Sequence, residues 1–252
     1  MDLRLQNKVV LITGGSKGIG RAIARAFHEE GARVAITARG EAELAEAAQE
    51  MDGLLPLPSD MTDPASRDEV MRRVLEHFGT IDILINNVGG SSGGAILDTD
   101  TALFEEAMKL NFYSAVDLSR KAAVSMKEKG AGSIINISSI YGREAGGKPT
   151  YNAAKAALIS FTKALADEVI PFGIRVNGIA PGSILHPTGN WQRRLEESPE
   201  KIKQFVETQI PAGRFGTVEE VAHVALFLAS EKASWVVGAT INVDGGQSRS
   251  NW

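Results

Sequence analysis

Short apolar runs alternate with longer amphipathic stretches along the whole chain. Short apolar runs suit parallel strands covered on both faces, whereas apolar residues three or four apart predict helices packed on a sheet. The predicted strands are residues 8–12, 31–39 (including the glycine that ends the preceding helix), 54–57, 81–85, 133–137, 174–179 and 240–243. The predicted helices are residues 21–30, 41–51, 64–78, 101–127, 151–170 and 217–230.

This alternation decides the fold class. Right-handed crossovers between successive strands build a doubly wound parallel sheet, so the pattern predicts an α/β fold of Rossmann type with about seven strands and helices on both faces. No linker interrupts the pattern, and residues 1–252 are expected to form a single dinucleotide-binding and catalytic domain.

The composition indicates which partners, metal sites and cellular compartment to expect for this domain. The 27 basic and 31 acidic residues leave a formal net charge of −4, which gives no reason to expect nucleic acid or an anionic membrane as partner. There is no cysteine, so disulfides and thiolate metal sites are excluded; no metal site is predicted, and a reducing compartment fits. The polar N-terminus lacks the apolar run of a secretory signal, and no apolar run could span a bilayer, so we expect a cytoplasmic protein.

A glycine-rich turn follows the first strand and opens the first helix. Such a turn allows close backbone approach, and the helix N-terminus offers free amides to a pyrophosphate; a tight turn without ligand is the plainer interpretation. The spacing is Gly-x-x-x-Gly-x-Gly, not the commoner Gly-x-Gly-x-x-Gly. The residues of this turn predicted to bind a cofactor are Gly14, Ser16, Lys17, Gly18, Ile19 and Gly20.

The tip of the second strand indicates which dinucleotide is bound. An acidic residue there would accept from the adenosine ribose, whereas an arginine accommodates a 2′-phosphate. This chain has Arg39 at the tip and no carboxylate before Glu41, and Lys17 offers a second cation. Each cation alone is commonly a solvated surface residue, but together they favour NADP(H) over NAD.

Other polar residues stand where strands end. Asp60, followed by Met61, could meet the adenine or simply cap the next helix, and Asn86 and Gly89 follow the fourth strand. Asn111 interrupts an amphipathic helix, which usually marks a hydrogen-bonded structural residue. Since ligands of such sheets bind at the carboxyl ends of the strands, we expect these residues on one rim.

Tyr151 and Lys155 are four residues apart at the start of a predicted helix, so they share one face. A phenol is a poor acid at neutral pH, and a nearby ammonium would lower its pKa toward the range of efficient acid and base catalysis. On an isolated helix the pair would more often be a solvated tyrosine and an unrelated lysine. Its position beside the rim favours chemistry.

Together these motifs resemble the short-chain dehydrogenase/reductase family over residues 13–246. The matching motifs are Thr13-Gly14-x-x-x-Gly18-x-Gly20, Asn86-Asn87-Val88-Gly89, Asn111, the Ser138-Ser139 pair, Tyr151-x-x-x-Lys155, Pro181-Gly182 and Val243-Asp244-Gly245-Gly246. The resemblance implies a tetrad: Tyr151 as acid or base, Lys155 lowering the tyrosine pKa and holding the nicotinamide ribose, a serine polarising the carbonyl, and Asn111 holding a proton-relaying water. It also implies cofactor contacts by Tyr151 and Lys155 and roles for Lys17 and Arg39 on the 2′-phosphate.

Two positions depart from the family pattern. The usual distance to the tyrosine selects Ser138 as catalytic serine, but the local pattern selects Ser139, which we prefer because a loop absorbs a deletion more easily than a strand absorbs a change of register. Where relatives often carry a threonine that meets the cofactor carboxamide, this chain has His186; Thr188 is the next hydroxyl, and Ile184 could offer its backbone instead.

Residues 183–211 form the longest insertion and mix aromatic with basic side chains. They are interpreted as a substrate-binding flap over the site, or else as a solvated surface excursion. The favoured activity is NADPH-dependent reduction of a ketone to a secondary alcohol, with a 3-oxoacyl thioester as first substrate class. A dehydrogenase of a sugar, polyol or cyclic alcohol is the second hypothesis, and an NADP-binding regulator without turnover is the third. The resemblance further implies a homotetramer.

Overall fold

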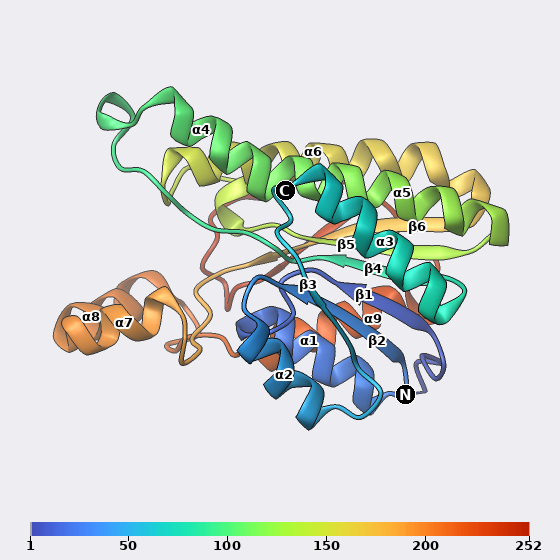
Figure 1. Cartoon of the computed structure of the whole chain (residues 1–252). Helices are drawn as coiled ribbons and strands as arrows, with labels where there is room; N and C mark the ends of the chain where they lie inside the picture. Colours follow the sequence, from blue (N-terminus) through green and yellow to red (C-terminus); the bar gives the residue numbers. More distant parts are fainter. Residues whose placement is uncertain (1, 252) are drawn as a thin grey trace.

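Seven parallel strands form one sheet at the centre of the protein (Figure 1). A computed structural model describes residues 2–251. The strand order is β3-β2-β1-β4-β5-β6-β7. The strands are β1 (Val9–Ile12), β2 (Arg33–Ala38), β3 (Leu55–Pro58), β4 (Ile83–Asn86), β5 (Gly132–Ile137), β6 (Ile174–Pro181) and β7 (Thr240–Val243).

This topology confirms the predicted doubly wound sheet. β1 lies between β2 and β4, and Val10 pairs with Val34 on one side and Ile83 on the other. From β1 the chain continues to β2 and β3 on one side of the sheet. It then crosses over to β4 on the other side of β1. Ligands of such sheets bind where the order reverses, at the carboxyl ends of the strands.

Two layers of helices cover the two faces of the sheet (Figure 1). One layer packs on a core that includes Ile23, Phe27 and Leu44, and contains α1 (Gly18–Glu29), α2 (Glu41–Glu50) and α9 (Val218–Ala229). The other packs on a core that includes Val74 and Leu118, and contains α3 (Pro64–Phe78), α5 (Ser114–Lys129) and α6 (Pro149–Val169). The strands are apolar on both faces because both faces are buried.

The predicted long helix from residue 101 is not continuous. It consists of α4 (Thr101–Met108), one wider π-helical turn η2 (Lys109–Tyr113) and α5. The amphipathic pattern continues through all three segments, which is why the sequence predicts one helix.

The insertion at 183–211 contains two short helices, α7 (Asn190–Glu197) and α8 (Pro199–Gln209). In Figure 1 they project from the body, beyond the sheet, as a separate arm. Trp191 of α7 stacks on Phe205 of α8, with ring centres 4.7 Å apart, and also contacts Phe215. Among residues 2–251, no helix is long and apolar enough to cross a membrane.

Candidate active site

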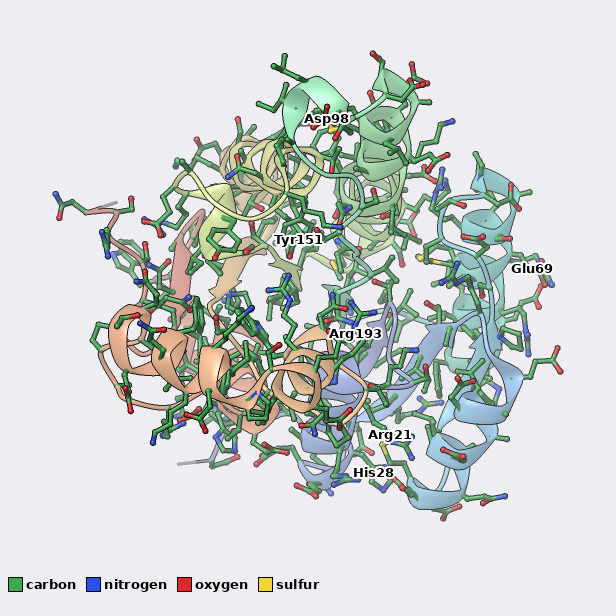
Figure 2. The ribbon with its side chains drawn as sticks, turned by 90° about the vertical axis from the view of Figure 1, so that its left-hand side faces the viewer. Arg21, His28, Glu69, Asp98, Tyr151 and Arg193 are labelled. Carbon is green, nitrogen blue, oxygen red and sulfur yellow. The ribbon has the colours of Figure 1, made fainter. Side chains whose placement is uncertain are left out.

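The predicted site residues lie along the carboxyl edge of the sheet. The strands are parallel, so their carboxyl ends share one edge, and the loops after β1, β4 and β5 leave the sheet there. In the view of Figure 2, Tyr151 lies near the centre, with Asp98 above it and Arg193 of α7 below it. The arm thus faces the same edge as the tyrosine.

The glycine-rich turn is built for close approach to an anion. Gly14 and Gly18 have φ values of +64° and +56°, which favour glycine. A Cβ on Gly20 would lie 2.2 Å from the Gly14 carbonyl oxygen, so only glycine fits there. Lys17 stands at the N-cap of α1 without a side-chain capping bond, and the first turn carries no acidic residue. The amides of this helix N-terminus are therefore available to a phosphate.

Asn87 holds this turn in place, a role that the sequence analysis did not assign. Its Nδ2 donates to the carbonyl oxygens of Thr13 and Gly14, at 3.0 and 3.1 Å. The Thr13 hydroxyl in turn accepts from the amides of Asn87 and Val88. These bonds tie the loop after β4 to the loop after β1, the two strands between which the sheet order reverses.

The side chain of Asn86 points into the core instead. Its Nδ2 donates to Ser119 Oγ and Asn136 Oδ1, at 2.9 and 2.8 Å, and Asn136 Nδ2 donates to Thr162 Oγ1. Asn86 therefore joins α5, β4, β5 and α6 through a buried polar chain. A cofactor contact by Asn86 would have to use its main chain.

The two cations expected near a 2′-phosphate are exposed at the rim. Arg39 directly follows β2, and Lys17 lies in the glycine-rich turn, which is bonded to β2 through Gly14 N to Thr37 Oγ1 (3.3 Å). Arg39 lies close enough to Asp60 to help lower the pKa of that carboxyl, after the larger effect of hydrogen bonds from Thr62.

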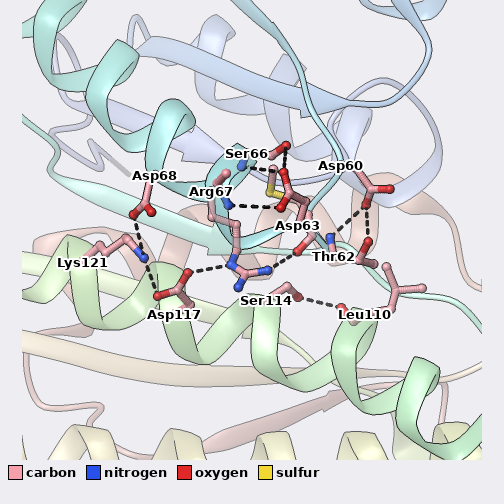
Figure 3. Close-up of polar contacts among 12 residues, drawn as sticks. Asp60, Thr62, Asp63, Ser66, Arg67, Asp68, Leu110, Ser114, Asp117 and Lys121 are labelled. Carbon is pink, nitrogen blue, oxygen red and sulfur yellow. Dashed lines mark hydrogen bonds and ion pairs between the residues drawn. The ribbon is translucent and has the colours of Figure 1, made fainter. Parts of the chain in front are cut away.

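Asp60 and Met61 form a turn that is fixed from behind. Asp60 Oδ1 accepts from the amide and the hydroxyl of Thr62, which is a capping-type turn. The Met61 side chain is buried in the core, and its carbonyl oxygen accepts from Arg67 Nη1 at 2.8 Å. Figure 3 shows Arg67 between this turn and Asp117 of α5, to which Nε donates at 2.6 Å. A cofactor contact by Met61 would therefore have to use its main-chain N–H.

Tyr151 and Lys155 lie together on α6, as their spacing predicts. Lys155 Nζ lies 5.6 Å from the centre of the Tyr151 ring and donates to the Ile137 carbonyl oxygen at 2.7 Å. Lys155 is 2% exposed, whereas Tyr151 is partly buried. The lysine is thus anchored to the end of β5 and the tyrosine is held beside it.

The charges of this pair differ from the sequence-based expectation that Lys155 lowers the tyrosine pKa. Burial raises the pKa of Tyr151, and an interaction with Ser139 opposes that rise. Burial also lowers the pKa of Lys155 to about 7, because no carboxylate compensates the loss of water. Desolvation is therefore the largest influence on the pKa of both groups.

The two adjacent serines make different contacts. Ser138 Oγ donates to the Lys155 carbonyl oxygen at 3.2 Å, a bond from the end of β5 to α6. Ser139 Oγ accepts from the Tyr141 amide and interacts with the Tyr151 side chain. Ser139 therefore faces the phenol, and Ser138 faces the helix backbone.

Asn111 lies in the π-helical turn, a distortion often found at functional sites. Its side chain is fully engaged: Oδ1 accepts from the Gly90 amide, and Nδ2 donates to the carbonyl oxygens of Gly90 and Ala107. A Cβ on Gly89 would lie 2.8 Å from Asn111 Oδ1 and 3.1 Å from Lys155 Nζ. Gly89 thus lies between the side chains of Asn111 and Lys155 and is close to both.

Ile184 lies in an extended segment that pairs with Gly216. The bonds run from Gly216 N to Ser183 O and from Leu185 N to Gly216 O, so the N–H and C=O of Ile184 itself are directed away from this pairing. Its side chain is buried in the core. The backbone N–H and C=O of Ile184 are therefore not used in this pairing.

These residues fit a nicotinamide dinucleotide. The uncapped N-terminus of α1, the glycines that admit close approach and the exposed cations after β1 and β2 suit its phosphates. Tyr151, Ser139 and Lys155 lie at the other part of the same edge. Among the described residues no cluster of histidine or acidic side chains could hold a metal ion.

The known proteins that are similar to this chain include reductases and a putative dehydrogenase. The family described as "Enoyl-(Acyl carrier protein) reductase" matches residues 14–248. The 3-oxoacyl-[acyl-carrier-protein] reductases of Thermotoga maritima and Escherichia coli K12 are each 36% identical, covering 97% of this chain and 99% and 98% of theirs. The solved structure of L-sorbose reductase from Gluconobacter frateurii, complexed with NADPH and L-sorbose, has a TM-score of 0.94 and 36% identity, covering 99% of this chain and all of that one. A putative gluconate dehydrogenase from Agrobacterium tumefaciens has a TM-score of 0.92 and 30% identity, with 99% of both chains covered.

Proposed function

The chain belongs to the short-chain dehydrogenase/reductase family, as its motifs predict, and it is an oxidoreductase of that family; from this premise we propose that it reduces a ketone to a secondary alcohol with NADPH. The proposal rests on one observation: Tyr151, Ser139 and Lys155 are grouped on the same carboxyl edge of the sheet as the glycine-rich turn. An acid facing the carbonyl oxygen and a held cofactor are what hydride transfer to a ketone requires.

In this proposal each side chain has one task. A bound NADPH supplies the hydride. Tyr151 keeps its proton at neutral pH, because burial raises its pKa, and gives that proton to the substrate oxygen as negative charge develops there. Ser139 donates to the same oxygen and holds it against the phenol. Lys155 holds the nicotinamide ribose, and Asn111 keeps the loop at Gly90 in position beside it.

The preference for NADPH over NADH rests on the second strand. Arg39 and Lys17 are exposed at the rim, and no carboxylate occupies the end of β2, where it would favour an unphosphorylated ribose. The two solved L-sorbose reductase structures with NADPH support the same choice. We also infer that the arm of α7 and α8 covers the substrate, and that the protein is cytoplasmic.

Two substrate classes are supported by different comparisons. The similarity to 3-oxoacyl-[acyl-carrier-protein] reductases favours a 3-oxoacyl thioester. The similarity to a structure that contains L-sorbose favours a ketose, with the reverse oxidation of a polyol. We place the thioester first because several relatives at 35–36% identity carry the name 3-oxoacyl-[acyl-carrier-protein] reductase.

A substrate panel tests the proposal. Purified enzyme is mixed with NADPH or NADH and with an acetoacetyl thioester, L-sorbose, other ketoses and a cyclic ketone, and cofactor absorbance is followed. We expect turnover with at least one ketone and a larger kcat/KM with NADPH. Tight NADPH binding without turnover on the whole panel would instead favour a regulator. A larger kcat/KM with NADH would overturn the cofactor preference.

A further inference from the structure

His186 lies between the glycine-rich turn and the start of the arm. A Cβ placed on Gly18 would meet the His186 ring atoms Cε1 and Nε2 at 2.9 and 3.1 Å. A Cβ on Gly189, which caps α7, would meet Nε2 at 2.7 Å. The imidazole therefore packs against the backbone at two glycines. One belongs to the cofactor turn and the other to the arm.

The position of this ring relative to Gly18 is informative. Gly18 opens α1 with a left-handed φ of +56°. The corresponding glycine of dinucleotide folds is small so that the backbone can approach the pyrophosphate closely. The side of Gly18 that lacks a Cβ is the side on which His186 lies. A diphosphate bound at this turn would therefore have the imidazole as a neighbour.

The chemistry of the ring suits a phosphate. His186 Nδ1 lies 3.3 Å from the Thr188 hydroxyl. When that hydroxyl donates to Nδ1, Nε2 carries the hydrogen and becomes a donor. Burial and the charge of Lys17 lower the pKa of His186, so the neutral ring with this donor is the form favoured at neutral pH. An anion placed between His186 and Lys17 would be bound by both.

We propose that His186 is a cofactor-binding residue whose Nε2 donates to the diphosphate of NADPH, and that this contact couples cofactor binding to the position of the arm (190–209). His186 follows the extended segment that is fixed to Gly216, and four residues later α7 begins at Asn190. The contact thus joins the phosphates to the first residues of the arm. This inference rests on the proposed NADPH dependence.

The test measures binding and arm protection without any substrate. The dissociation constant of NADPH is determined by fluorescence titration for the wild type, His186→Ala and His186→Gln, whose amide can replace the Nε2 donor. His223→Ala, an exposed histidine of α9, is the matched control. Hydrogen exchange of peptides covering 190–209 is followed with and without saturating NADPH.

We expect His186→Ala to weaken NADPH binding about tenfold or more, the usual effect of losing a hydrogen bond to a charged group, and to lose most of the protection that NADPH gives the arm. His186→Gln is expected to keep most of the affinity, and His223→Ala to equal the wild type. An affinity of His186→Ala within twofold of the wild type, or tighter, overturns the contact.

Weaker binding with unchanged arm protection overturns the coupling. Failure of the wild type itself to bind NADPH would contradict the proposed function. Binding and turnover by the wild type with an unaffected His186→Ala would contradict only this inference.

Discussion

The burial of Lys155 lowers the stability of the folded protein, and the proposed catalytic role of this lysine explains why it is buried. A lysine that is 2% exposed and bonded to one carbonyl oxygen has lost most of its hydration without gaining an opposite charge. Its pKa falls from 10.5 to about 7. Such strongly shifted groups gather at functional sites, because the position is selected for chemistry and not for stability.

The shift of Lys155 predicts a pH-dependent effect of removing it. The unfolded lysine binds its proton up to about pH 10.5 and the folded one only to about pH 7, so stability rises as pH rises through that window and the full penalty is present below it. The difference between the two pKa values corresponds to about 5 kcal/mol of lost stability. The hydrogen bond from Lys155 to the Ile137 carbonyl oxygen offsets part of this loss. We expect Lys155→Met to stabilise the cofactor-free protein by about 3 kcal/mol at pH 6.

Urea unfolding at pH 6, 8 and 10 measures this difference. The gain from Lys155→Met should shrink steadily and vanish near pH 10. Lys163→Met, an exposed lysine on the same helix that pairs with Asp167, should change stability by less than about 1 kcal/mol at every pH. A Lys155→Met variant that is less stable than the wild type at pH 6 would show that the lysine is not held at such a cost.

The two serines give a second prediction at the residue scale. Ser139 interacts with the phenol, whereas Ser138 bonds to the backbone of α6. We expect Ser139→Ala to lower kcat about 10²–10³-fold with an unchanged NADPH dissociation constant. Ser138→Ala should lose about 1 kcal/mol of stability and little activity. The reverse order of the two kcat losses would assign the catalytic role to Ser138.

Sequence reasoning reached most single residues of the site but not all of their contacts. Tyr151, Lys155 and the glycines occupy the positions that their spacing predicts. The division of labour between Asn86 and Asn87 was not predictable, because adjacent residues at a strand end point in opposite directions and the sequence does not say which faces the turn. The position of the His186 ring depends on a loop whose path no local pattern specifies.

At the scale of elements, α3 supports the cofactor rim from behind. Arg67 is 6% exposed and joins the Met61 carbonyl oxygen to Asp117 of α5, and Lys121 completes the cluster by pairing with Asp117 and Asp68. Figure 3 shows these contacts beside the turn that carries Asp60. The helix thus fixes a loop that begins at the rim.

Removal of Arg67 should disturb both stability and the rim. Arg67→Ala leaves a buried carbonyl oxygen and a partly buried carboxylate with fewer partners, so we expect a loss of about 2–3 kcal/mol in urea unfolding and weaker NADPH binding. Arg72→Ala is the matched control, because Arg72 lies on the same helix and pairs with Glu69 and Glu76 at the surface. It should change stability by less than about 1 kcal/mol. Equal losses in the two variants would contradict a special role for Arg67.

Helices and strands were predictable from the sequence where buried positions recur with a regular period. They were less predictable where residues of the site interrupt that period. The seven strands and the helices that cover them follow from apolar runs and amphipathic stretches. The π-helical turn around Asn111 was missed, because one extra residue in a turn barely changes the apolar pattern of a helix. The two helices of the arm were predicted only as an insertion, since their aromatic residues pack mainly on each other.

At the scale of the whole molecule, the outer surface of α5 and α6 supports the expectation of a homo-oligomer. A hollow of about 490 Å³ between these helices is lined by apolar and charged side chains, among them Val124, Lys127, Leu165 and Glu168. Val124 is 65% exposed, and a mixed apolar and charged surface of this kind suits contact with a second copy.

We expect the protein to exceed the 26.9 kDa of one chain in solution, and the family resemblance predicts about four times that mass. Light scattering coupled to size-exclusion chromatography measures the mass of the protein in solution. Val124→Glu should shift the mass downward. Leu97→Glu, which likewise replaces an apolar residue by a charged one but at a 98% exposed position outside the hollow, should not. A wild type of single-chain mass at micromolar concentration would rule out the tetramer.

In the proposed reaction Tyr151 is the proton donor of an NADPH-dependent ketone reductase. The most direct measurement compares wild type and Tyr151→Phe for kcat on the best ketone of the panel and for the NADPH dissociation constant. We predict a loss of kcat of about 10³-fold or more with NADPH affinity changed by less than about threefold, since only the phenol oxygen is removed. A Tyr151→Phe variant that retains more than a tenth of the wild-type kcat would show that Tyr151 is not the proton donor.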